Sequence, residues 1–312
     1  MTLQIILLIL GLAMVVFGAD WLVDGASAIA RKAGISEFVI GLTIVGFGTS
    51  CPELVVSLTG AIQGNADISI GNVVGSNIFN TLFILGLTAL VAPIAVTSEN
   101  RRKDIPIALL VTFAFLLCGI LGGVISRVEG IIFLLVFAAY LIYCFKSGKS
   151  DDAAEAVEEK VRNIWLAILL VILGLAGLIA GGDLFVNNAV AIARELGVSD
   201  KFIAITLLAG GTSMPELATC IVASAKHKDQ LALGNILGSN VFNILLIIGS
   251  AAVVTPLSIA NITMVDSAVL AASALFVWIW TFTGRKDTID RWEGALMTAC
   301  FVGYYVWLFV NL

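Results

Sequence analysis

The chain has 312 residues, of which 60% are hydrophobic and 12% are charged, and its mean hydropathy is +1.06. An average soluble domain is roughly 45 to 50% apolar, so this composition indicates an integral membrane protein and excludes a soluble globular one. The net charge of −5 on so apolar a chain gives no sign of a nucleic-acid or acidic partner, and no nucleic-acid partner is expected. The 5 cysteines lie in or beside apolar runs without C-x-x-C pairing, so neither a disulfide framework nor a thiolate metal site is expected.

Membrane-spanning helices need about 20 mostly apolar residues each. Stretches of this kind lie approximately at 3–28, 37–62, 68–92, 104–122, 129–146, 163–191, 200–225, 231–254, 263–283 and 290–311. The first stretch has the length of a signal-peptide core, but no basic segment precedes it and no clear cleavage site follows it. We therefore expect an all-α integral membrane protein with ten transmembrane helices, the first of which is retained.

Two polar segments of the sequence occur twice. "GTSCPEL" at Gly48 returns as "GTSMPEL" at Gly211, and "GNVVGSNIFN" at Gly71 returns as "GNILGSNVFN" at Gly234. Both pairs are separated by 163 residues, and the same offset holds elsewhere in each half without a gap. The constant register predicts the duplication of a five-helix unit.

Because five is odd, the second unit must enter the membrane from the side opposite to the first. We expect a first repeat at 1–146, a linker at 147–162 and a second, inverted repeat at 163–312. Connections on one side of the expected helices hold 14 of the 17 Lys and Arg residues, which places that side in the cytoplasm. Both termini are then expected outside the cell membrane and the linker inside. Inverted repeats are typical of secondary transporters.

The glutamates of the first repeated segment are expected near the middle of the membrane. Glu53 lies about 16 residues into its span, which at about 1.5 Å per residue is close to the bilayer interior, and Glu216 has the same depth. An acidic group there costs several kcal/mol unless it is compensated, yet none of the 17 Lys and Arg residues lies in the middle of a span. A bound cation is the simplest compensation, and a protonated or hydrogen-bonded structural glutamate is the alternative.

Proline precedes each glutamate, at Pro52 and Pro215. Proline has no N–H to donate to the carbonyl four residues back, so each helix is expected to break or kink there and to free carbonyl oxygens near the carboxylate. An ordinary proline kink is the alternative, but it does not require the Thr-Ser pair that stands before each proline. Thr49 shares a helical face with Glu53, and Ser50 adds an oxygen on the same turn.

The second repeated segment adds hydroxyl and amide groups at i, i+4 spacing, and its glycines at 71, 75, 234 and 238 are expected to let the helices approach closely. The side-chain oxygens together come from Glu53, Glu216, Thr49, Ser50, Thr212, Ser213, Ser76, Asn80, Ser239 and Asn243. An all-oxygen set suits hard cations such as Ca²⁺ and is compatible with Na⁺, whereas zinc or copper would need imidazole or thiolate ligands. Two glutamates balance one divalent ion. Competition between that ion and several monovalent ions is a physical basis for antiport.

The paired "GTSxPEL" and "GNxxGSNxFN" segments resemble the two alpha repeats of the calcium/cation antiporter superfamily, in particular those of prokaryotic sodium/calcium exchangers. The resemblance covers nearly the whole chain, including ten helices and external termini. It implies a secondary active antiporter that exchanges Na⁺ for Ca²⁺ by alternating access, with ions bound mid-membrane between the two repeats. In that family helices 1 and 6 slide across the other eight.

The resemblance also implies roles for individual residues. Glu53 and Glu216 would bind Ca²⁺, and Na⁺ or Ca²⁺ would be ligated by Thr49, Ser50, Thr212 and Ser213. The site would further be lined by Ser76, Asn80 and Ser239, with backbone carbonyls contributed by Gly46 and Ala209. Asn243 is a departure, because relatives often carry aspartate there and potassium-dependent exchangers rely on that acid, so potassium coupling is not expected.

Other functions remain open at this point. Exchange of H⁺ for Ca²⁺ is the nearest alternative, since glutamates can exchange protons for calcium, although the many hydroxyls favour sodium. A channel would use the same oxygens without obligatory exchange. An intramembrane metalloprotease would need a motif such as H-E-x-x-H, and the single histidine, His227, lies in a turn. No enzymatic activity, resident cofactor or obligate protein partner is expected beyond the transported ions and the lipid bilayer.

Four more polar residues lie late in the first and sixth expected spans: Asp20, Asp24, Asp183 and Asn187. They are expected either to line access passages for ions or to have capping and water-facing roles.

Overall fold

The computed structural model describes residues 2–147, 163–198, 209–285 and 287–311. These residues form helices joined by short connections, in which π-helical segments carry the label η. The helical elements are α1 (Thr2–Ala33), α2 (Glu37–Ile40), η1 (Gly41–Val45), α3 (Gly46–Thr49), α4 (Cys51–Ile62), α5 (Ala66–Ile78), η2 (Phe79–Ile84), α6 (Leu85–Val91), η3 (Asn100–Asp104), α7 (Ile105–Gly122), α8 (Arg127–Ser147), α9 (Ile164–Glu195), α11 (Ala209–Gly211), α12 (Met214–Ala225), α13 (Asp229–Phe242), η6 (Asn243–Ile248), α14 (Gly249–Val254), α15 (Met264–Trp280) and α16 (Arg291–Asn311).

Long apolar helices dominate the fold. Among the described residues, 7 helices are long and apolar enough to cross a membrane, and the bent pair formed by residues 37–49 and 51–62 is an eighth candidate. Two shorter apolar helices, α12 and α15, add to these. The predicted helical, multi-pass membrane architecture is therefore confirmed. Each expected span coincides with helical structure, except that the start of the one at 200–225 lies outside the described residues.

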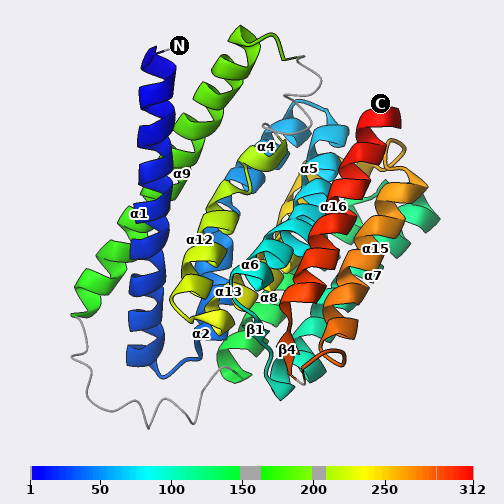
Figure 1. Cartoon of the computed structure of the whole chain (residues 1–312). Coiled ribbons are helices and arrows are strands. Elements are labelled where there is room, and N and C mark those ends of the chain that lie inside the picture. Colours follow the sequence, from blue (N-terminus) through cyan, green and yellow to red (C-terminus); the bar gives the residue numbers. More distant parts are fainter. Residues whose placement is uncertain (1, 148–162, 199–208, 286, 312) are drawn as a thin grey trace.

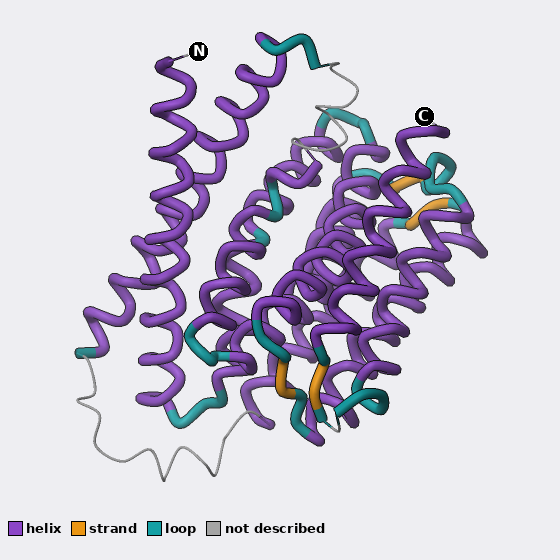
Figure 2. The backbone as a smooth tube through the Cα atoms, viewed as in Figure 1, coloured by secondary structure: helices purple, strands orange, loops and turns teal. Residues whose placement is uncertain are grey.

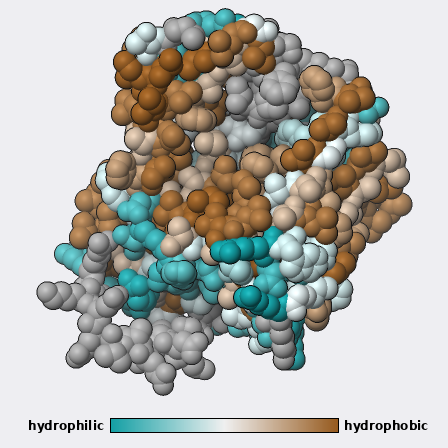
Figure 3. Space-filling view, viewed as in Figure 1, coloured by the Kyte–Doolittle hydropathy of each residue, from teal (hydrophilic) through white to brown (hydrophobic). Residues whose placement is uncertain are grey.

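Two of the long helices form the centre of the molecule. In the helices at 67–91 and 229–254, 78% of the most apolar window is buried, against 22% to 33% in the others. Both central helices contain one of the repeated "GNxxGSNxFN" segments. The surrounding helices expose large apolar side chains, which cover much of the molecular face in Figure 3, with polar side chains gathered toward its lower end. Such a surface suits contact with lipid.

Four two-residue strands, which the sequence did not predict, pair at the ends of the helices. They are β1 (Ile94–Ala95), β2 (Val124–Ile125), β3 (Leu257–Ser258) and β4 (Thr288–Ile289). β1 pairs antiparallel with β4, and β2 pairs antiparallel with β3. Each pair thus joins a segment from the first half of the chain to one from the second, and Figure 2 shows the two pairs at opposite ends of the helices.

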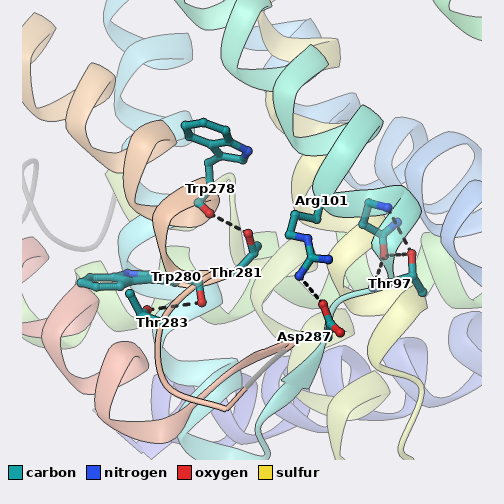
Figure 4. Close-up of polar contacts among 8 residues, drawn as sticks. Thr97, Arg101, Trp278, Trp280, Thr281, Thr283 and Asp287 are labelled. Carbon is teal, nitrogen blue, oxygen red and sulfur yellow. Dashed lines mark hydrogen bonds and ion pairs between the residues drawn. The ribbon is translucent and has the colours of Figure 1, made fainter.

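An ion pair strengthens the β1–β4 end. Arg101, in η3, bonds to Asp287 beside β4 (Figure 4). The Asp287 carbonyl also accepts from the Val96 backbone N–H at 2.9 Å, and the Arg101 guanidinium lies 5.4 Å from the centre of the Phe282 ring. These contacts connect the two halves of the chain at one end of the helices.

The repeated glycines behave as predicted where their neighbours are described. A Cβ at Gly234 would lie 2.2 Å from the Phe38 carbonyl oxygen, and one at Gly238 would lie 2.3 Å from the Leu42 carbonyl oxygen. These glycines therefore allow α13 to pack directly against the backbone of α2 and η1. At positions 71 and 75 no described atom lies within 4 Å of such a Cβ. The counterparts of Phe38 and Leu42 in the second repeat, 163 residues further on, are residues 201 and 205. Both lie outside the described residues.

The two 32-residue helices, α1 and α9, cross each other on one side of the molecule (Figure 1). Glycines lie at the crossing on both helices. A Cβ at Gly174 would lie 2.7 Å from the Gly18 carbonyl oxygen, and a Cβ at Gly18 would lie 2.8 Å from the Gly174 carbonyl oxygen. The two backbones are therefore in direct contact, as in other small-residue helix crossings in membranes.

Substitution of Gly174 by alanine is expected to separate α1 from α9. Because the added methyl group meets backbone atoms, the substitution should cost about 1–3 kcal/mol of stability, measured as a lower midpoint of thermal unfolding in detergent. Gly303→Ala is the matched control, since a Cβ at this exposed position of α16 would meet no described atom within 4 Å beyond the adjacent backbone of its own helix. Equal midpoints for the two variants would contradict the close crossing.

Candidate functional site

Both repeated glutamates lie in the first turn of a helix that follows a break. α4 begins after Ser50, whose backbone has φ −83° and ψ 6°, and α12 begins after Ser213, with φ −90° and ψ 9°. The helices on either side of Ser50 differ in direction by 48°. The predicted break at the prolines is therefore confirmed. A helix N-terminus carries partial positive charge, which favours the carboxylates of Glu53 and Glu216 at these positions.

The serine before each broken helix bonds to the glutamate of the other. Ser50 Oγ donates to Glu216 Oε1 at 3.0 Å, and Ser213 Oγ donates to Glu53 Oε1 at 3.0 Å. Glu53 is 1% exposed and Glu216 is 0% exposed, so both carboxyl groups are inside the protein. Hydrogen bonds to a charged acceptor are strong and directional. Each carboxyl group is thus oriented by the opposite half of the chain, through one of its two oxygens.

The second oxygen of each carboxyl group has no hydrogen-bond donor among the described residues. Glu53 Oε2, Glu216 Oε2, Asn80 Oδ1 and Asn243 Oδ1 are buried and accept no hydrogen bond from the part of the chain that the structure describes. Within the same residues, no ion pair involves either glutamate. A buried acceptor without a partner costs about 1–3 kcal/mol. A hard cation is the kind of ligand that satisfies several acceptor oxygens together.

The Gly46 carbonyl oxygen lies beside this group but is not free. It accepts from the Ser50 backbone N–H at 3.1 Å, and it lies 3.4 Å from Thr49 Oγ1 and 3.5 Å from Ser239 Oγ. Ser239 Oγ also lies 3.4 Å from Glu216 Oε1. The structure therefore brings Gly46 and Ser239 to the carboxyl groups, and the helix break does not leave this particular carbonyl without donors.

Of the other expected ligands, Thr49 lies near the Glu216 carboxyl group and Thr212 lies near that of Glu53. Thr49 is buried, and its hydroxyl donates to Asn235 Oδ1 at 3.1 Å, on α13. Ser76 is buried in α5. Thr212 is half-buried in the break before α12. Ala209 is the first residue of α11, and the segment before it at 199–208 lies outside the described residues.

Sequence reasoning missed several asparagines that support the site. Asn72 Nδ2 donates to the Glu53 carbonyl oxygen at 3.1 Å and to Ser57 Oγ at 2.9 Å, which ties α5 to α4. Asn235 occupies the same place in the second copy and accepts from Thr49. Asn77 and Asn240 bond to each other across the two halves, since Asn77 Nδ2 donates to the Asn240 carbonyl oxygen at 3.1 Å. All four recur in "GNxxGSNxFN", so their repetition inside an apolar run was an available signal.

A cavity of about 400 Å³ lies against the start of both broken helices. Pro52, Pro215 and Thr212 line it from the site, and Asp183 and Asn187 line it from α9. Both α9 residues are exposed. Of the two roles expected for them, lining an access passage fits this position.

Asp20 and Asp24, at the same offset in α1, have a different environment. Lys226 Nζ lies 2.6 Å from Asp20 Oδ1 and 2.7 Å from Asp24 Oδ1, which ties α1 to the end of α12. Partial burial opposes the charged form of Lys226, but the hydrogen bonds to the two carboxylates outweigh it, and its pKa lies above the ordinary value. These two aspartates therefore have a structural role in the conformation that the structure describes.

Addition of Ca²⁺ to the purified protein is expected to raise its midpoint of thermal unfolding, since a ligand that binds the folded state adds about 2.7 kcal/mol of stability at a hundredfold excess over Kd. Glu53→Gln and Glu216→Gln keep the side-chain shape and remove the charge, so they should abolish most of this rise. Glu99→Gln is the control, because Glu99 is half exposed and pairs with Lys103 away from the site. The same Ca²⁺ response in all four proteins would refute the site.

Comparisons with known proteins find relatives that match nearly the whole chain. The chain is 36% identical to the inner membrane protein YrbG of Escherichia coli (strain K12), over 99% of this chain and 96% of that protein. It is 33% identical to the sodium/calcium exchanger MaX1 of Methanosarcina acetivorans, over 99% of each. A solved structure of the sodium-calcium exchanger NCX_Mj, soaked with zero Na⁺ and Ca²⁺, superimposes with a TM-score of 0.87 at 33% identity, over 98% of this chain and 99% of that one.

The family described as "Sodium/calcium exchanger protein" matches residues 3–146 and 166–310, which together make up most of the chain. The resemblance seen in the repeated segments is thereby confirmed, and the chain belongs to the sodium/calcium exchanger protein family.

Proposed function

We propose that this protein is a secondary active antiporter that exchanges Na⁺ for Ca²⁺ across the cell membrane. The observation that carries the proposal is the group of four buried acceptor oxygens on Glu53, Glu216, Asn80 and Asn243 that have no donor among the described residues. The relatives named for this activity and the structures of NCX_Mj soaked with Na⁺ and Ca²⁺ support it.

The charge of the site determines what it exchanges. Two ionised carboxylates balance one Ca²⁺ ion, and the neutral hydroxyl and amide oxygens complete its coordination. Na⁺ is also a hard cation, so the same oxygens can hold monovalent ions instead. Because one set of oxygens cannot hold both cargoes at once, binding of one ion promotes release of the other. This competition couples the two fluxes.

The proposed ligands are the residues expected from the sequence: Glu53, Glu216, Thr49, Ser50, Thr212, Ser213, Ser76, Asn80, Ser239 and Asn243, with the backbone carbonyls of Gly46 and Ala209. The serine bonds between the halves support the grouping, because they bring the two carboxyl groups together. The ions themselves are the cargo, and no resident cofactor is part of the proposal.

Transport proceeds by alternating access between two inverted five-helix repeats, at 1–146 and 163–312. The equal lengths of α1 and α9 support this organisation, as do α4 and α12, which begin 163 residues apart. The glycine crossing makes α1 and α9 the natural pair to slide across the remaining helices. The cavity beside α9 is the passage through which ions reach the site in this conformation.

An outward-directed Na⁺ gradient is expected to drive Ca²⁺ uptake into proteoliposomes at clamped pH. Glu53→Gln and Glu216→Gln should each reduce this uptake at least a hundredfold, because loss of one buried charge removes several kcal/mol of cation binding. The Glu99→Gln variant should retain it. Tracer ⁴⁵Ca²⁺ uptake is the measurement.

The same assay distinguishes the other functions. Uptake driven by a pH gradient without Na⁺ would indicate exchange of H⁺ for Ca²⁺. Uptake that needs no counter-ion at all would indicate a channel. Calcium exchange retained by both glutamine variants would overturn the proposed site.

The charge distribution of the connections predicts that both termini are outside and that the linker at 147–162 is cytoplasmic. In a background without the 5 native cysteines, a cysteine at Ser150 should react with a membrane-impermeant maleimide only in inside-out vesicles. A cysteine at Thr2 should react only in right-side-out vesicles. The reverse labelling pattern would contradict this orientation.

A further inference from the structure

Two asparagines outside the proposed ligand set, Asn77 and Asn240, lie about one turn before Asn80 and Asn243. Each bonds to the amide in the other half of the chain. Asn243 Nδ2 donates to Asn77 Oδ1 at 2.8 Å, and Asn80 Nδ2 donates to Asn240 Oδ1 at 3.3 Å. Asn77, Asn80 and Asn243 are each 1% exposed, so these bonds lie inside the protein.

A backbone group fixes the orientation of the Asn77 amide. Asn77 Nδ2 donates to the Asn240 carbonyl oxygen at 3.1 Å, and a carbonyl oxygen can only accept, so the NH₂ group must face it. Asn77 Oδ1 consequently faces Asn243, where it requires a donor. Asn240 is held by a second bond as well, since its Nδ2 donates to Thr81 Oγ1 at 2.8 Å.

These bonds decide which atoms of Asn80 and Asn243 remain for a ligand. Their NH₂ groups each donate to an asparagine of the other half, and their Oδ1 atoms are the buried oxygens without a donor among the described residues. An amide turned the other way would present N–H groups to a cation, which would weaken binding. A carboxylate at position 243 would place an acceptor against Asn77 Oδ1, which is unfavourable in a buried site.

We propose that Asn77 and Asn240 are positioning residues that hold the amides of Asn243 and Asn80 with their oxygens toward the ions. By requiring a donor at position 243, Asn77 also favours a neutral side chain there, so the site keeps two carboxylates. The inference rests on the proposed ion site, and it assigns part of the cation specificity to residues outside the proposed ligand set.

Asn77→Ala removes the acceptor that orients Asn243. It is expected to raise the KM for Ca²⁺ about tenfold while the maximal rate per folded protein changes less than twofold. Asn240→Ala, at a half-buried position, should act in the same direction through Asn80 and serves if Asn77→Ala folds poorly. Asn100→Ala is the control, because Asn100 is a buried asparagine whose bonds to Thr97 and Asp104 lie away from the site.

A purely structural role for Asn77 would lower the unfolding midpoint and leave the KM unchanged, as expected for Asn100→Ala. An unchanged KM in both Asn77→Ala and Asn240→Ala would overturn the inference while leaving the proposed function intact. Failure of the unsubstituted protein both to exchange Ca²⁺ and to be stabilised by it would overturn the proposed function, and the inference with it.

A double-mutant cycle tests the specificity step. Asn243→Asp is expected to change cation affinity more than folding. Its gain in Ca²⁺ affinity should be about tenfold larger in the Asn77→Ala background than with Asn77 present, because the acceptor that opposes the new carboxylate is then absent. The Ca²⁺-dependent shift of the unfolding midpoint measures this affinity without transport. The same effect of Asn243→Asp in both backgrounds would show that Asn77 does not control the charge at position 243.

Discussion

The structure is organised around two buried carboxyl groups, neither of which forms an ion pair within the part of the chain that the structure describes. Each is held through one oxygen by a serine from the opposite half of the chain, and each keeps a second oxygen without a donor among the described residues. A charge in this environment is costly, and a bound cation of the kind proposed would lower that cost. In the proposed site, ion binding and the packing of the two halves are therefore parts of the same energetic balance.

The helices around the carboxyl groups meet this constraint in different ways. The breaks before α4 and α12 place each glutamate at a helix N-terminus, where the partial charge is positive. The two central helices supply amides rather than charges, and most of their length is buried. The outer helices expose apolar side chains and contribute little to the site.

Local rules predicted some features of the site and fold correctly. The break at Pro52 follows from the missing N–H of proline, and the burial of Glu53 and Glu216 follows from their depth in apolar spans. The bonds of Ser50 and Ser213 to the opposite glutamates could not be predicted, because spacing along one helix does not say which segment lies across from it. The two-residue strands could not be predicted either, because they are too short to show an alternating sequence pattern.

The hydrogen bonds among the four asparagines at 77, 80, 240 and 243 were only partly predictable from the sequence. Repetition marked Asn77 and Asn240 as clearly as it marked Asn80 and Asn243, but only the three-dimensional arrangement shows that one pair bonds to the other. The π-helical segments η2 and η6 begin next to Asn80 and at Asn243, respectively. Such segments change the helical phase by one residue, which simple 3.6-residue periodicity does not detect.

The ion pairs of Lys226 with Asp20 and Asp24 have no copy in the other half of the sequence. The residue at the same offset from Lys226 is Gln63, which is neutral, and the residues facing it by this relation would be Asp183 and Asn187. An exchange of conformations between the halves would break salt bridges on one membrane face without forming equivalent ones on the other. The two end states of such a cycle would then differ in free energy even with identical solutions on both sides. The protein at rest would favour the conformation that keeps the Lys226 salt bridges.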